Sequence, residues 1–258
     1  MAQTALITGA SSGIGLELAR IFARQGHNTV LVARSGDKLA ELESELVQHR
    51  VQVRSITADL SRMEEVKNVH RQLQEEGIPI DFLVNNAGFG HYGLFHETDW
   101  NKEAMMIDLN VKSLTYMTKL FVDDMVRRRS GRILNVASTA AFQPGPTMAV
   151  YFATKAYVLS FSEAISSELE GTGVTVTALC PGATESSFWK VANMEDARLI
   201  KGRKLPSSAE VARYGYEALM KGKVVAVHGW LNKLLSESVR LAPRALVRKA
   251  VRKMQENG

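Results

Sequence analysis

Apolar and polar positions along this chain form alternating blocks that predict alternating strands and helices. Short apolar runs of strand length lie at residues 4–8, 28–33, 51–56, 80–85, 132–137, 174–179 and 223–228. Apolar residues at helical spacing start at residue 14 and recur over residues 38–48, 63–74, 100–129, 151–169 and 207–220. Strands that alternate with helices favour a parallel sheet with helices on both faces. The pattern therefore predicts a single doubly wound α/β domain.

The longest of these helices, over residues 100–129, has an apolar face that suits either the core or a subunit contact. The residues expected on this face are Met105, Leu109, Leu114, Met117 and Phe121.

After residue 230 the pattern changes to a basic amphipathic segment. Leu235, Val239, Ala242, Leu246 and Ala250 are expected on one helical face. On another face, Arg240, Arg244, Arg248 and Arg252 recur every four residues. Pro243 predicts two short helices in place of one. We therefore divide the chain into a catalytic domain of residues 1–230 and a tail of residues 231–258.

Two uses of the tail are compatible with its sequence. A basic amphipathic segment suits an anionic membrane surface, or a phosphorylated carrier such as coenzyme A or acyl carrier protein. Alternatively the segment packs on its own domain or on a subunit partner and leaves a solvated basic face.

Composition narrows the class of protein. With 258 residues, 45% hydrophobic and 23% charged, the chain is typical of a globular protein with one full core. Residues 221–258 carry nine Lys or Arg against two Glu, so the net +5 of the chain leaves −2 on residues 1–220. The domain therefore gives no indication of nucleic-acid binding. The single Cys180, the missing signal-peptide pattern and the lack of a membrane-spanning apolar run lead us to expect a cytoplasmic protein.

A glycine-rich turn joins the first apolar run to the first helical pattern. It comprises Gly9, Ser11, Ser12, Gly13, Ile14 and Gly15. A glycine turn between a strand and a helix places a helix N-terminus against a phosphate group, because no Cβ separates the ligand from the backbone N–H groups. The alternative is a tight turn that binds nothing.

Polar groups follow several of the other predicted strands. Ligands of a parallel α/β sheet bind outside the carboxyl ends of its strands. The residues at those ends are Arg34, Asp59, Asn85-Asn86-Ala87-Gly88, Ser138 and Pro181-Gly182. Tyr151 and Lys155 share one face of the following helix because they are four residues apart. A hydroxyl, a phenol and an amine would converge there, which is suitable for proton transfer to a carbonyl oxygen during hydride transfer.

These motifs together resemble the short-chain dehydrogenase/reductase family. They are Thr8-Gly-x-x-x-Gly13-x-Gly15, Asn85–Gly88, Asn110, Ser138, Tyr151-x-x-x-Lys155 and Pro181-Gly182, and the resemblance covers residues 3 to about 230. It implies a Rossmann fold with seven parallel strands and a nicotinamide dinucleotide at the carboxyl edge of the sheet. The implied cofactor contacts are Gly9, Ser11, Ser12, Gly13, Ile14, Gly15, Arg34, Asp59, Leu60, Asn86, Ala87, Gly88, Tyr151, Lys155, Pro181, Gly182 and Thr184.

The resemblance also implies catalytic roles. Tyr151 would be the general acid in reduction, and the charge of Lys155 would lower the tyrosine pKa from about 10 while its amine bonds the nicotinamide ribose. Ser138 would hold the substrate oxygen. Asn110 would anchor a water in a proton relay, although an asparagine bonded to helix backbone is an alternative. The alternative for Tyr151 and Lys155 is that they are an ordinary pair of side chains on a helix surface.

Cofactor choice depends on the end of the second strand. An NAD enzyme has an acidic residue there, whereas this chain has Ala33-Arg34, and a guanidinium suits the 2′-phosphate of NADP(H). We therefore favour NADP(H) over NAD(H), with an exposed arginine that does not discriminate as the alternative. Asp59 would bond the adenine amine or, equally, cap the helix that starts near Ser61.

An apolar, aromatic pocket is expected for the substrate. Its predicted residues are Phe89, Tyr92, Phe142, Met148, Phe188 and Trp189, some of which would serve equally well as ordinary packing. Residues 184–205 look like the mobile lid of this family. Six histidines and one cysteine show no ligand spacing, so no metal is expected.

The sequence favours an NADP(H)-dependent oxidoreductase acting on a small lipophilic carbonyl or alcohol. The alternatives are a non-catalytic dinucleotide-binding regulator and, among enzymes, an NAD-linked alcohol or hydroxysteroid dehydrogenase or a 3-oxoacyl reductase. Family members usually pair through the helices that here span residues 100–129 and 151–169. We therefore expect a homodimer or homotetramer.

Overall fold

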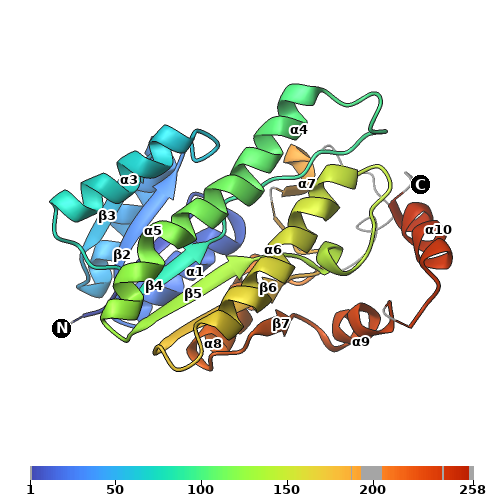
Figure 1. Ribbon diagram of the computed structural model, residues 1–258. Coiled ribbons are helices and arrows are strands. Elements are labelled where there is room, and N and C mark those ends of the chain that lie inside the picture. The colour runs from blue at the N-terminus through green and yellow to red at the C-terminus, as the bar shows by residue number, and fades with distance from the viewer. Residues whose placement is uncertain (1, 187, 193–204, 240, 256–258) are drawn as a thin grey trace.

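The computed structural model describes residues 2–186, 188–192, 205–239 and 241–255 (Figure 1). Seven strands in this part of the chain form one sheet in the order β3-β2-β1-β4-β5-β6-β7, and every neighbouring pair is parallel. The strands are β1 (Thr4–Thr8), β2 (Asn28–Ala33), β3 (Val53–Thr57), β4 (Phe82–Asn85), β5 (Gly131–Val136), β6 (Val174–Cys180) and β7 (Val225–Val227). The predicted seven-stranded doubly wound sheet is confirmed.

Helices cover both faces of the sheet (Figure 1). One face is buried by α1 (Gly13–Arg24), α2 (Gly36–Leu46) and α8 (Ser208–Met220). The other is buried by α3 (Met63–Glu75), α5 (Leu114–Arg127) and α6 (Ala149–Glu168). The central strands are almost entirely buried, which explains why their sequences are continuous apolar runs.

The site is positioned by the place where the strand order reverses. β1 lies between β2 and β4, so the chain leaves β1 toward one side of the sheet and later returns to its other side. Loops at the carboxyl ends of β1 and β4 therefore diverge and leave a crevice. The glycine turn follows β1, and Asn86-Ala87-Gly88 follows β4.

The predicted helix over residues 100–129 has three parts. These are α4 (Trp100–Ile107), a π-helical segment η2 (Asp108–Ser113) and α5. Leu114, Met117 and Phe121 are buried as expected, but Met105 is 38% exposed and Met106 is buried in its place. The inward face of α4 also includes the buried Glu103, and Asn110 follows on η2. Because polar residues lie on the inner face, the apolar pattern did not predict correctly which side of the helix is buried.

The tail forms two helices, as Pro243 predicts. They are α9 (Trp230–Ser238) and α10 (Arg244–Gln255). The predicted apolar face is only partly correct. Val239 and Ala242 pack against the domain, but Leu246 is 61% exposed and Leu235 53%, while Val247 and Val251 are buried. Because the chain breaks at Pro243, the helical periodicity of α9 does not continue into α10. The two helices therefore do not share one apolar face.

The tail helices differ in how they meet the domain. α10 packs on the domain through its valines, whereas Trp230, Leu234 and Leu235 of α9 are more than half exposed. Contact with a membrane or an acyl carrier, like the division at residue 230, stays a prediction, and Arg240 lies outside the described residues. None of the described helices is both long enough and apolar enough to cross a bilayer.

Smaller elements complete the chain. They are the short 3-10 turns η1 (Val47–His49) and η3 (Thr139–Phe142), and α7 (Phe188–Val191). α7 falls within the predicted lid of residues 184–205, of which residues 187 and 193–204 lie outside the described part of the chain.

Candidate active site

The Thr8 side chain joins the loops at the carboxyl ends of β1 and β4. Its hydroxyl oxygen accepts hydrogen bonds from the backbone N–H groups of Asn86 and Ala87, both at 3.0 Å, and donates to the Val84 carbonyl at 3.2 Å. The Asn86 amide in turn donates to the Thr8 carbonyl at 2.9 Å and to the Gly9 carbonyl at 3.3 Å. The two loops that border the crevice are therefore fixed to each other.

The glycines of the first turn are required by these contacts and by the backbone. Gly9 has φ of +68°, which favours glycine, and a Cβ on it would meet the Asn86 amide nitrogen at 2.7 Å. A Cβ on Gly15 would lie 2.4 Å from that same nitrogen. The glycines thus let the β4 loop close against the turn.

The N-terminus of α1 faces the crevice, and its first turn is suited to binding an anion. No acidic residue lies in that turn, and the Ser12 side chain makes no capping hydrogen bond to it. Ser11, Ser12 and Ile14 are only partly buried. Free backbone N–H groups at a helix N-terminus attract phosphate, so this turn fits the pyrophosphate of a dinucleotide.

The residues after β2 and β3 lie next to this turn. Arg34 is exposed directly after the buried Ala33, and no ion pair forms on it in the described part of the chain. Asp59 accepts hydrogen bonds from the backbone and hydroxyl of Ser61, at 3.1 and 2.8 Å. Asp59 therefore supports the turn before α3 but does not cap the helix, which begins at Met63 with Arg62 at its N-cap. Leu60 is 5% exposed.

Ser138, Tyr151 and Lys155 meet at the carboxyl end of β5. The Ser138 hydroxyl hydrogen-bonds the Tyr151 phenol, and Lys155 lies one helical turn further along α6. The Lys155 ammonium donates to the Val136 carbonyl at 2.7 Å and lies 5.8 Å from the centre of the Tyr151 ring. The sequence-predicted triad is therefore assembled, rather than dispersed on a helix surface.

Burial dominates the acid–base properties of this triad. It raises the pKa of Tyr151 to about 12, against a smaller lowering by the Ser138 hydrogen bond. It lowers the pKa of Lys155 to about 8 and raises that of the neighbouring Cys180 to about 12. The expected net lowering of the Tyr151 pKa is therefore wrong, because desolvation disfavours the phenolate. At neutral pH Tyr151 is therefore a protonated phenol.

Asn110 fixes the loop that leaves β4. Its amide group donates to the Phe89 carbonyl at 2.9 Å and accepts from the Phe89 backbone N–H at 3.1 Å. It also donates to the Thr154 hydroxyl at 3.2 Å, which donates to the Tyr151 carbonyl at 2.7 Å. A Cβ on Gly88 would lie 2.9 Å from the Asn110 amide oxygen and 3.6 Å from the Lys155 nitrogen. Asn110 thus links the β4 loop to the helix of the triad, and its role in a water relay stays a prediction.

The segment after β6 closes the other side of the crevice. The Thr139 N–H donates to the Pro181 carbonyl at 2.8 Å, which ties this segment to Ser138. A Cβ on Gly182 would lie 2.4 Å from the Asn232 amide nitrogen of α9. Thr184 is buried, donates to the Gly182 carbonyl at 2.9 Å, and its own carbonyl accepts from the Trp189 indole at 2.7 Å.

Four of the six predicted substrate residues gather near Tyr151. Tyr92, Met148, Phe188 and Trp189 share one apolar cluster with it. The Phe188 ring is 5.3 Å from the Tyr151 ring, centre to centre.

The other two lie elsewhere. Phe142 packs against a different cluster, which includes Ala137 and Val158. It does not join the cluster around Tyr151, so its place in the substrate pocket stays a prediction. Phe89 takes part through its backbone bonds to Asn110, and its side chain joins none of the described core clusters.

Several contributing residues escaped the sequence analysis. The Thr154 hydroxyl connects Asn110 to α6, and a hydroxyl on a helix carries no distinctive pattern. His91, in the β4 loop, lies 3.2 Å from the carboxylate of the buried Glu103 on α4, ring nitrogen to oxygen. The sequence offered one indication of Glu103: it lies three residues before Met106, so the two share the inward face of α4.

Comparisons with known proteins identify the family and agree with the fold. A family model described as short chain dehydrogenase matches residues 3–197. An uncharacterized oxidoreductase of Staphylococcus aureus is 30% identical over 199 residues, which are 77% of this chain and 85% of that protein.

Solved structures share the fold over almost the full length. A short-chain dehydrogenase from Sphingobium yanoikuyae in complex with NADPH is 32% identical, with a TM-score of 0.83 and 93% of both chains covered. An alcohol dehydrogenase from Comamonas testosteroni, described as specific for bulky-bulky ketones, is 30% identical, with a TM-score of 0.79 and 96% of both chains covered. Each of these relatives is described as an oxidoreductase or a dehydrogenase.

The hydroxyl of Thr8 can be tested by its removal. Thr8→Val keeps the shape of the side chain but removes the hydrogen-bond partner of the Ala87 N–H and one of the two partners of the Asn86 N–H, so we expect the free energy of unfolding to fall by about 1 to 3 kcal/mol. Thr177→Val is the matched control, because the Thr177 hydroxyl on β6 is buried with no hydrogen-bond partner in the described structure. That change should be neutral or slightly stabilising. Urea unfolding followed by circular dichroism measures both, and equal effects of the two changes would contradict the role of Thr8.

Proposed function

The chain belongs to the short-chain dehydrogenase family, and we propose that it is an NADP(H)-dependent enzyme that interconverts a ketone or aldehyde and its alcohol on a lipophilic substrate. The observation that carries the proposal is the buried, protonated Tyr151, bonded to Ser138 at the edge of a crevice that fits a dinucleotide. Lys155 lies one turn away with its ammonium held by the Val136 carbonyl.

Each residue has a part in the proton transfer. NADP(H), when bound, supplies or accepts the hydride. Tyr151 gives its phenolic proton to the substrate oxygen in reduction, and Ser138 donates a hydrogen bond toward the same oxygen. Lys155 holds positive charge near the phenol, which limits the cost of the phenolate that forms. A protein that only bound a dinucleotide would have no use for this proton donor, which argues against the regulatory alternative.

The preference for NADP(H) rests on Arg34. Its guanidinium is exposed at the end of β2, where an NAD enzyme has an acid. A planar guanidinium forms paired hydrogen bonds with a phosphate, and the related Sphingobium dehydrogenase is complexed with NADPH.

The substrate class follows from the side chains around Tyr151. Tyr92, Met148, Phe188 and Trp189 present an apolar and aromatic surface to the phenol. Such a surface favours a carbonyl compound with large hydrophobic substituents. The related Comamonas enzyme, described as specific for bulky-bulky ketones, supports the same class.

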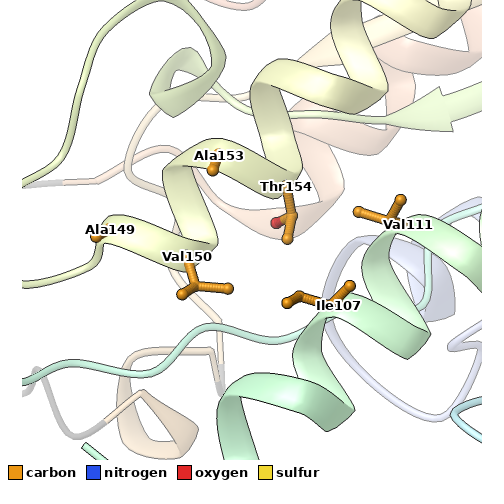
Figure 2. A pocket seen from close by; sticks show the side chains of 6 residues that line it. All are labelled: Ile107, Val111, Ala149, Val150, Ala153 and Thr154. Atoms are coloured by element: carbon orange, nitrogen blue, oxygen red, sulfur yellow. The ribbon is translucent and has the colours of Figure 1, made fainter. Parts of the chain in front are cut away.

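We also propose that the protein is a homo-oligomer that pairs through α4 and α6. An open groove of about 360 Å³ lies between these helices, lined by Ile107, Val111, Ala149, Val150, Ala153 and Thr154 (Figure 2). Its lining is apolar except for the Thr154 hydroxyl, which is already bonded to Asn110 and the helix backbone. A second copy of the same helices would fill it with matching apolar side chains.

Cofactor preference can be measured before any substrate is known. We expect NADPH to bind at least tenfold more tightly than NADH in a fluorescence titration, because Arg34 pairs with the 2′-phosphate. Arg34→Ala should erase that gap, at about 1.4 kcal/mol for each factor of ten. Arg71→Ala, an exposed arginine on α3, is the control and should leave it intact. Equal binding of both dinucleotides by the unmodified protein would show that Arg34 does not discriminate.

The role of Tyr151 can be tested by substitution and by pH. Tyr151→Phe should lower the rate of NADPH-dependent reduction of a bulky aryl ketone by about 10² to 10⁴-fold, the usual contribution of a general acid, while NADPH still binds. Tyr157→Phe, on the exposed side of α6, is the control. In the unmodified enzyme the pKa of about 12 keeps the proton on Tyr151 from pH 7 to 9, whereas Lys155, with a pKa of about 8, loses its charge over that range. Reduction should therefore fall as the Lys155 charge is lost. Oxidation needs the phenolate and should rise steeply over that range.

The proposed subunit contact can be tested at the centre of the groove. Ala153→Arg places a long charged side chain in the groove, so the protein should change from an oligomer to a smaller species by light scattering. Arg71→Ala again serves as a control, since it lies outside the contact. A monomeric mass for the unmodified protein at micromolar concentration would overturn the proposal.

A further inference from the structure

The buried face of α10 packs against the apolar side chains that surround the catalytic tyrosine. Val247 is 9% exposed and Val251 is 3% exposed. Both belong to the cluster that contains Met148, Phe152 and, partly buried, Tyr151. Figure 1 shows α10 beside the end of α6 that carries Tyr151. About one hundred residues of chain separate these groups, so the contact is a feature of the folded tail.

Three other segments meet the same cluster. A Cβ on Gly90, in the β4 loop, would lie 2.7 Å from the Phe188 ring and 3.0 Å from the Met148 side chain. Phe188 on α7 faces the Tyr151 ring, and Trp189 lies edge-on to Phe188 at 5.4 Å between ring centres. Side chains from the β4 loop, the start of α6, α7 and α10 thus share one apolar cluster with Tyr151.

The composition of α10 leaves its valines as its apolar attachment. The helix carries Arg244, Arg248, Lys249, Arg252 and Lys253 and no acidic residue. Its other large apolar residues, Leu246 and Met254, are 61% and 44% exposed. A helix of this length is marginal in water by itself, so its position depends on burial of this one face. The two valines therefore define where α10 lies relative to Tyr151.

We propose that α10 forms the outer wall of the substrate site, with Val247 and Val251 determining how large a hydrophobic substituent the site accepts. The proposal rests on the proposed function and makes it more specific. The substrate is a ketone whose carbonyl is held by Tyr151 and Ser138 and whose larger apolar substituent extends toward α10. A pocket wall discriminates substrates by the volume it leaves, and a difference of a few methylene groups is enough to change selectivity measurably.

The test compares bulky and small ketones in variants of the wall. The measured quantity is the ratio of kcat/KM for a diaryl ketone to kcat/KM for cyclohexanone, with NADPH as reductant. Val251→Ala widens the site and should raise this ratio at least threefold. Val251→Phe fills the site and should lower it at least tenfold. Because all variants keep Tyr151 and the crevice, NADPH binding by fluorescence should stay within twofold.

Two controls keep the outcome clear. Leu246→Ala changes the exposed face of the same helix and should leave the ratio within twofold of the unmodified protein. Val247→Ala provides a second opening of the wall if Val251→Phe unfolds in a thermal melt. Unchanged ratios in the folded wall variants would overturn the inference while leaving the enzyme intact. Failure of the unmodified protein to reduce either ketone would instead count against the proposed function itself.

Discussion

One hydroxyl group, that of Thr8, connects the two halves of the sheet at the point where the site forms. β1 and β4 are adjacent strands whose loops must separate to leave a crevice, yet those loops must also hold a constant spacing. The Thr8 hydroxyl meets both requirements because it bonds the backbone of Asn86 and Ala87 without filling the crevice itself. The glycines on either side follow from this contact, since a Cβ at Gly9 or Gly15 would displace the Asn86 amide. The dinucleotide turn is thus shaped by protein contacts before any ligand enters.

Behind that crevice the triad is governed by desolvation. Burial opposes charge on both members of the pair, so it raises the pKa of Tyr151 and lowers that of Lys155. Lys155 keeps a strong hydrogen bond to the Val136 carbonyl, which offsets part of the cost of a buried ammonium. The result is a neutral proton donor beside a cation whose charge is retained at neutral pH. Such a pair suits the reduction that we propose, in which Tyr151 begins protonated.

The sequence predicted the sheet and the triad because both leave direct marks on it. Buried parallel strands appear in the sequence as continuous apolar runs, and the residues that follow them lie at the carboxyl edge of the sheet. The proximity of Ser138 and Tyr151 could therefore be predicted. Helix faces were harder, because the inward side of α4 and η2 carries Glu103 and Asn110, so Met105 was chosen where Met106 is buried. Phe142 packs against a cluster other than the one around Tyr151, which composition does not reveal. In the tail, Pro243 predicted that there are two helices, but it did not predict which face of the second helix is buried.

The position of α10 also has a consequence for the order in which the molecule is completed during synthesis. The dinucleotide crevice needs only residues up to Gly88 for its two locked loops, and Tyr151 and Lys155 follow as α6 emerges. Val247 and Val251 are made about one hundred residues later, so the nascent chain exposes the apolar surface around Tyr151 for much of its translation. A growing chain in this state presents a ready binding surface to chaperones near the ribosome.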